Sequence, residues 1–102
     1  MNTHENKVAL ITGANRGIGF ETAKGLGELG ITVIIGARDL AKGTAAAEKL
    51  RAQGMKAEAI AYDAADPNAA DVVYAHIADK HGKLDILVNN AGAIYEQLLG
   101  KN

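Results

Sequence analysis

A glycine-rich turn directly behind an apolar run is the feature that most constrains the fold of this chain. Residues 8–11 are apolar, and three glycines follow before a segment with helical spacing. A buried strand that turns through glycines into a helix exposes backbone N–H groups at the helix N-terminus, where they bind phosphate groups. The segment therefore predicts a site for the pyrophosphate of a dinucleotide. Its expected members are Gly13, Asn15, Arg16, Gly17, Ile18 and Gly19.

Strands and helices are expected to alternate along the chain. Apolar and β-branched runs predict strands over residues 8–12, 32–36, 57–62 and 84–89. Helices are expected from the glycines up to Gly30, from about Leu40 to Gln53, and up to about Lys80. This alternation predicts an α/β fold with a parallel sheet covered by helices on both faces. We see no internal linker, so residues 1–102 are predicted to form one domain.

Local signals mark the helices and where they begin. Asp39 is expected to cap the second helix, and Asp66 to cap the third, with Pro67 at its first position. Apolar residues near helical spacing predict the first helix itself. These residues are Ile18, Ala23, Leu26 and Leu29.

Charge and composition exclude several classes of function. A net charge of −1, with both signs interspersed, leaves no basic stripe for nucleic acid or anionic lipid. No apolar run approaches the roughly 20 residues of a transmembrane helix, and the polar start lacks the apolar core of a signal peptide. The chain contains no cysteine, which fits a reducing compartment. We therefore expect a cytoplasmic protein without a metal site, a nucleic-acid partner or a membrane anchor.

A second motif, asparagine-asparagine-alanine-glycine at residues 89–92, ends the fourth expected strand. Together with the threonine and glycines of residues 12–19, it resembles the classical short-chain dehydrogenases/reductases, especially the carbonyl-reductase-like members. The resemblance implies a Rossmann-type three-layer fold with strand order 3-2-1-4, half of a doubly wound sheet. It also implies that Asn90, Ala91 and Gly92 lie beside the cofactor ribose. Asn89 is expected to brace the sheet through side-chain-to-backbone hydrogen bonds.

The end of the second expected strand distinguishes between two cofactors. Chains that prefer NAD place an acidic side chain there, about 20 residues past the glycines, to bind the ribose 2′-hydroxyl. This chain has Arg38, and a guanidinium binds a 2′-phosphate where a carboxylate would repel it. The resemblance gives Arg16 as a second cation on that phosphate. NADP(H) is therefore the expected cofactor, and NAD with Asp39 as its ribose ligand is the alternative.

Asp63 and Ala64 follow the third expected strand. The resemblance places the Asp63 side chain on the adenine and Ala64 at the edge of the cofactor. A turn-forming role explains Asp63 equally well, so the sequence leaves both roles open.

The chain lacks the catalytic groups that the resemblance implies. Those groups are a tyrosine with a lysine four residues later and a nearby serine, whereas this chain has no serine and no such tyrosine. Tyr95 is interpreted as an ordinary residue of a C-terminal turn, and His81 as compensating the dipole of the third helix. We therefore expect no catalytic residue in this chain.

Two interpretations of the function follow from these observations. The first is the N-terminal part of an NADP(H)-dependent reductase of carbonyls or alcohols, which binds the cofactor without turnover. A small substrate would then bind only a full-length form. The second is a naturally short, non-catalytic module for dinucleotide binding or protein interaction. Either way, an exposed sheet edge is expected to lower stability or promote self-association.

Overall fold

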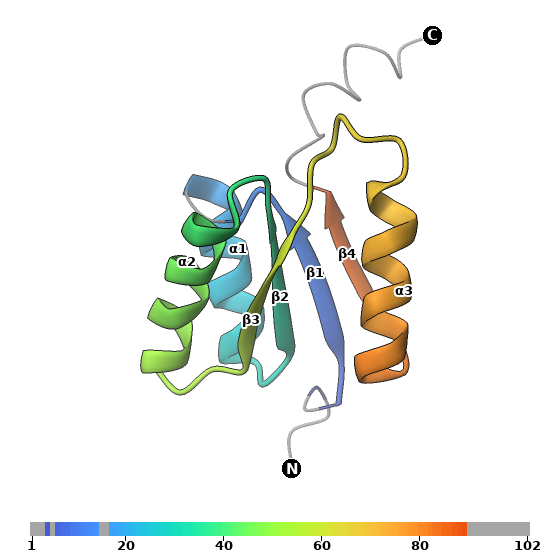
Figure 1. The fold of residues 1–102 in the computed structure, drawn as a ribbon. Coiled ribbons are helices and arrows are strands. Elements are labelled where there is room, and N and C mark those ends of the chain that lie inside the picture. The colour runs from blue at the N-terminus through green and yellow to red at the C-terminus, as the bar shows by residue number, and fades with distance from the viewer. Residues whose placement is uncertain (1–3, 5, 15–16, 90–102) are drawn as a thin grey trace, which may run out of the picture.

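The computed structural model describes residues 4, 6–14 and 17–89 of the chain. Within these residues, strands and helices alternate, and the strands form one parallel sheet of order β3-β2-β1-β4 (Figure 1). The strands are β1 (Val8–Thr12), β2 (Thr32–Ala37), β3 (Ala57–Ala61) and β4 (Ile86–Asn89). The helices are α1 (Gly17–Glu28), α2 (Leu40–Ala52) and α3 (Ala69–His81). The expected α/β class and strand order are confirmed.

Helices cover both faces of the sheet, α1 and α2 on one face and α3 on the other (Figure 1). In β1, Ile11 belongs to the core cluster beneath α1 and α2, whereas Leu10 packs with Val73 and Ile77 of α3. All of β1 is buried because it has a strand on each side and helices over both faces. This position accounts for its continuous apolar run. No helix in the described part of the chain is long and apolar enough to cross a bilayer.

Small residues form the buried side of α1. Gly19, Ala23 and Gly27 are buried, whereas Ile18 is 80% exposed and Leu29 is 48% exposed. Ile18 and Leu29, two of the apolar residues that indicate this helix in the sequence, therefore lie outside its buried side. Glycine and alanine at intervals of four residues let the helix approach the sheet closely. A Cβ added at Gly27 would lie 2.8 Å from the nearest side-chain atom.

The start of α3 also differs from the prediction. The helix begins at Ala69, and its N-cap is Asn68 rather than Asp66. Asp66 instead organises a turn: its Oδ1 accepts the Asn68 N–H at 2.9 Å, and its carbonyl accepts the Ala69 N–H at 3.1 Å. Pro67 occupies the second position of this turn, where its fixed φ is favourable. The sequence signals for a helix cap and for such a turn are therefore alike.

Strand β4 begins at Ile86 rather than at residue 84, because Asp85 has another role. Its Oδ2 accepts the Val8 N–H at 2.8 Å, while its own N–H donates to the Val8 carbonyl at 2.9 Å. The Val8 hydrogen bond, aided by the Lys83 ammonium 3.2 Å away, holds the pKa of the Asp85 carboxyl below its usual value. Asp85 thereby joins the amino ends of β1 and β4.

Among the described residues, β3 and β4 are the outer strands of the sheet, and they differ in the groups along them. At β3, Arg51 Nη1 donates to the Ala57 carbonyl at 2.7 Å. Glu58 of the same strand lies 3.3 Å from Lys80 Nζ and 3.2 Å from His81 Nε2, at the end of α3. Strand β4 carries no charged residue. We conclude that β3 is the better protected edge, because charged groups on an edge strand oppose pairing with another chain.

Candidate functional site

The glycine turn connects β1 to α1 at the carboxyl edge of the sheet (Figure 1). Gly13 and Gly17 have φ angles of 68° and 63°, in the left-handed region that favours glycine. The Gly13 N–H donates to the Gly36 carbonyl at 2.8 Å, which ties the turn to β2. The first turn of α1 contains no acidic residue, so no carboxylate within that turn offsets the positive end of the helix dipole. This geometry is suited to an anion.

A buried polar contact joins the carboxyl ends of β1 and β4. Thr12 is only 1% exposed, and its Oγ1 lies 3.1 Å from Asn89 Oδ1 and 3.5 Å from the Val88 carbonyl. Asn89 therefore does join the two strands, but this contact is made with the Thr12 side chain and not, as was expected, with a backbone group. Thr12 belongs to the motif seen in the sequence, but its contact with Asn89 was not predicted, although a hydroxyl at the end of a buried strand requires a partner. The contact brings the end of β4 beside the glycine turn.

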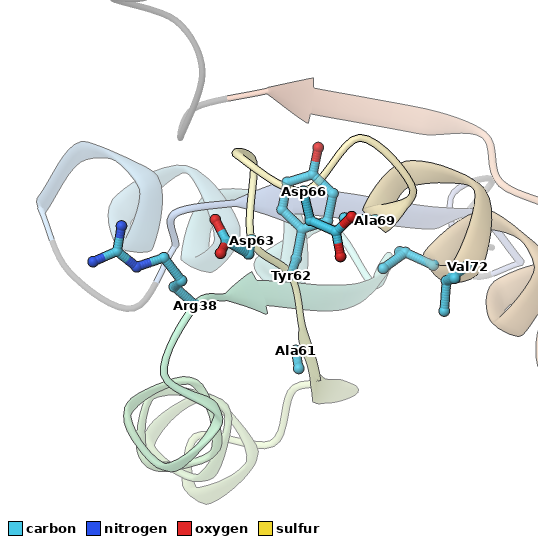
Figure 2. Close-up of a pocket in the computed structure, with 8 residues that line it drawn as sticks. Arg38, Ala61, Tyr62, Asp63, Asp66, Ala69 and Val72 are labelled. Carbon is cyan, nitrogen blue, oxygen red and sulfur yellow. The ribbon is translucent and has the colours of Figure 1, made fainter.

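Arg38 and Asp39 lie between β2 and α2. Arg38 is exposed and extends away from the end of β2 (Figure 2). Asp39 is the N-cap of α2, as predicted, and its Oδ1 accepts the N–H groups of Ala41 at 3.0 Å and Lys42 at 3.4 Å. Both residues are exposed; the Asp39 carboxylate caps the helix through Oδ1, and the Arg38 guanidinium is the cationic group at this strand end.

A hollow of about 220 Å³ extends from Arg38 past the end of β3 to α3 (Figure 2). Tyr62, Asp63, Asp66 and Val72 are among the residues that line it. Asp63 Oδ1 accepts the Ala65 N–H at 3.0 Å, so Asp63 does form a turn, and Ala64 is exposed beside it. Tyr62 was not among the predicted site residues, although its place on the α3-facing side follows from alternation with Glu58 and Ile60.

The structure brings the described candidates to one edge of the sheet. Gly13, Gly17, Ile18, Gly19, Arg38, Asp63 and Ala64 all follow the carboxyl ends of β1, β2 or β3. The candidates Asn15, Arg16, Asn90, Ala91 and Gly92 lie outside the described residues. Among the residues that the structure describes, no group of three or more histidine, aspartate or glutamate side chains could hold a metal ion.

Strand order β3-β2-β1-β4, with a glycine turn after the central strand, defines a Rossmann-type nucleotide-binding fold. A family model described as short chain dehydrogenase matches residues 7–101. The chain therefore belongs to the short-chain dehydrogenase family, and its match falls in the N-terminal part of its relatives.

Individual relatives and solved structures agree with this assignment. Salutaridine reductase from Papaver somniferum is 44% identical over 86% of this chain and 29% of its own length. Mouse (Mus musculus) carbonyl reductase [NADPH] 3 is 37% identical over 88% of this chain and 33% of its own length. A metagenomic short-chain oxidoreductase in complex with NADP superposes with a TM-score of 0.81 at 39% identity, covering 85% of this chain and 39% of that protein. The chain spans about a third of the length of the curated relatives it matches.

Proposed function

We propose that residues 1–102 form the NADP(H)-binding domain of a short-chain dehydrogenase/reductase that acts on carbonyl or alcohol substrates. The observation that carries the proposal is the exposed Arg38 after β2, beside an Asp39 carboxylate engaged in capping α2. A guanidinium favours the 2′-phosphate that distinguishes NADP from NAD. The NADP complex of a similar structure and the NADPH named for a relative support this cofactor.

The described residues fit a dinucleotide. Among the described residues, a Cβ placed at Gly17 would meet no atom within 4 Å, which leaves room beside the turn into α1. In our proposal the pyrophosphate lies against this turn, the 2′-phosphate on Arg38 and the adenine near Asp63 and Ala64. The further binding residues are Asn15, Arg16, Ile18, Asn90, Ala91 and Gly92, which we propose from the family resemblance.

The chemistry would be divided between the cofactor and the polypeptide. Bound NADPH supplies the hydride for reduction of a carbonyl, and the protein must add an oriented proton donor. The chain has no serine, and none of its tyrosines is followed by lysine at the fourth position. We therefore propose that this chain binds and orients NADP(H) but does not turn substrate over. Carbonyl-dependent oxidation of NADPH by the purified chain would contradict this part.

Substitution of Arg38 by aspartate tests the cofactor assignment. Dissociation constants for NADPH and NADH are measured by calorimetry on the 102-residue chain and on Arg38→Asp. Loss of a charge-assisted contact of about 2 kcal/mol should weaken NADPH binding about thirtyfold, while NADH binding changes by less than about threefold. Lys49→Asp, at the other end of α2, makes the same change in net charge and should leave both constants unchanged. An unaltered NADPH-to-NADH ratio in Arg38→Asp would refute the assignment.

The coding sequence after Asn102 distinguishes this proposal from the non-catalytic module. An open reading frame that encodes a tyrosine with a lysine four residues later supports the reductase. A stop codon directly after Asn102 supports the short module instead.

We also propose that the isolated chain associates with itself through β4. Leu87 is 48% exposed, and its register partner Leu10 places it on the α3-facing side of the sheet. An apolar edge strand without charge invites pairing with another chain. Analytical ultracentrifugation of the chain should show concentration-dependent association, and Leu87→Lys should reduce it. A monomer at all concentrations, with a sharp and concentration-independent thermal transition, would count against this proposal.

A further inference from the structure

Met55 lies where the ends of α1 and α2 meet. Its backbone N–H donates to the Leu50 carbonyl at 3.1 Å, and the Gly54 N–H donates to the Arg51 carbonyl at 2.9 Å. With Gly54 at a φ of 89°, these hydrogen bonds form a Schellman motif, in which the residue after the glycine commonly packs an apolar side chain back onto its own helix. The main chain therefore fixes the point from which the Met55 side chain extends.

The thioether of Met55 packs directly against the buried side of α1. A Cβ added at Gly27 would lie 2.8 Å from Met55 Sδ and 3.2 Å from Met55 Cγ. The thioether therefore occupies the space that a side chain at position 27 would fill. Met55 and Leu26 of α1 pack against the same core cluster, which also contains Leu50 of α2. This contact joins the last turn of α1 to the loop between α2 and β3.

Oxidants have few reactive side chains to attack in this chain. Cysteine, which peroxides oxidise readily, is absent, and Met1 is the only methionine besides Met55. Met55 is only half-buried, and residues 51–54 immediately before it are exposed. Mild oxidation is therefore directed to Met1 and Met55, and a small oxidant can approach Met55 from the loop side.

We propose that Met55 is an oxidation site, and that its conversion to methionine sulfoxide loosens the packing of α1 on the loop between α2 and β3. Hydrogen peroxide transfers one oxygen atom to Sδ: the O–O bond breaks, an S–O bond forms, the sulfur loses two electrons and the peroxide is reduced to water. A thioether is a soft, apolar group that fills irregular gaps. The sulfoxide is polar and larger, so it loses the close contact with Gly27. Methionine sulfoxide reductases reverse the step, which makes the site a switch.

Peroxide treatment of the folded 102-residue chain tests this site. Trypsin cleaves after lysine and arginine, so it places the two methionines in separate peptides, residues 1–7 and 52–56. We expect mass spectrometry to show one added oxygen on the 52–56 peptide. The oxidised chain should melt about 4–8 °C lower than the untreated chain. Methionine sulfoxide reductases A and B should remove the oxygen and restore the melting temperature.

Two variants separate Met55 from the rest of the chain. Met55→Leu keeps an apolar side chain of similar volume, so its melting temperature should not change on peroxide treatment. Met55→Gln introduces a polar group and should melt lower than the unsubstituted chain without any peroxide. Reversal by the reductases needs no substitution, so it tests the proposal even if a variant does not fold.

Three results would overturn the inference. The first is an unmodified Met55 under conditions that oxidise Met1 completely. The second is a sulfoxide at Met55 with an unchanged melting temperature. The third is an equal loss of thermal stability in peroxide-treated Met55→Leu. None of these measurements involves a nucleotide, so their outcome is separate from that of the cofactor assignment.

Discussion

Substitution of Gly43 by alanine should destabilise the protein although alanine is the better helix former. Gly43 lies on the buried side of α2, and a Cβ there would lie 2.9 Å from Ala37 Cβ and 3.5 Å from Ala59 Cβ. Both neighbours are methyl groups fixed directly to strand backbone, so neither can rotate away. To restore an ordinary carbon–carbon contact, α2 and β2 would have to separate by about 0.6 Å.

Two opposing free-energy contributions determine the size of the effect. Alanine in a helix interior is favoured over glycine by about 0.5–1 kcal/mol. Overpacking of a tight core contact costs about 1–3 kcal/mol. We therefore expect Gly43→Ala to lower the free energy of unfolding by about 1 kcal/mol, which corresponds to a melting temperature about 4–8 °C lower for a domain of this size.

Gly25 provides the matched control in α1. A Cβ at Gly25 would meet nothing within 4 Å, so Gly25→Ala should raise the free energy of unfolding by about 0.5–1 kcal/mol. Gly27→Ala should fall between the two, because its nearest neighbour is the movable sulfur of Met55 at 2.8 Å. The free energies are measured by urea unfolding followed by far-ultraviolet circular dichroism. If Gly43→Ala proves as stable as Gly25→Ala, the reasoning is refuted, because the close packing of α2 on β2 would then not require glycine at position 43.

Two further predictions concern the ends of β1. Thr12→Val removes the hydroxyl beside Asn89 and should lower the free energy of unfolding, measured in urea, by about 1–2 kcal/mol. Thr12→Ser keeps the hydroxyl and should retain most of the stability. Equal losses of stability in the two variants would argue against the hydroxyl contact. Because the pKa of Asp85 is lowered by Val8 and Lys83, its contribution to stability is present above its unfolded-state pKa and disappears as the pH falls through its folded-state pKa. The free energy of unfolding, measured by urea titration, should therefore fall less steeply between pH 5 and pH 3 for Asp85→Asn than for the unsubstituted chain. Parallel plots of the free energy of unfolding against pH would contradict the stabilising role of the Asp85 carboxylate.

Local signals in the sequence were sufficient for most of the fold. The apolar run of β1 reflects its burial on every side, and Asp39 caps α2 as its position predicts. The signals were ambiguous where two local structures use the same residues, because aspartate and proline serve both a helix start and the turn found at Asp66. On α1 the apolar pattern indicates the helix but not its buried side, since close approach to the sheet requires Gly19 and Gly27 there.

The contacts between distant residues were not predictable in the same way. Thr12 meets Asn89 and Val8 meets Asp85 across separations of 77 residues. Neither contact has a local sequence pattern, because each depends on the register of two strands. For the candidate site, the sequence identified the glycine turn and Arg38, but Tyr62 and the hollow beside it depend on how α3 packs over β3.

The central position of β1 has a consequence for the order in which the chain folds. Ala9 pairs with Val33 after 24 residues, but its partner in β4 is Ile86. Closing the longer loop costs more entropy, and distant pairings slow folding. During synthesis β1 is therefore an edge strand, able to pair only with β2, until β4 leaves the ribosome. We expect the β1–β2–β3 unit with α1 and α2 to form first, and the docking of β4 to complete the sheet.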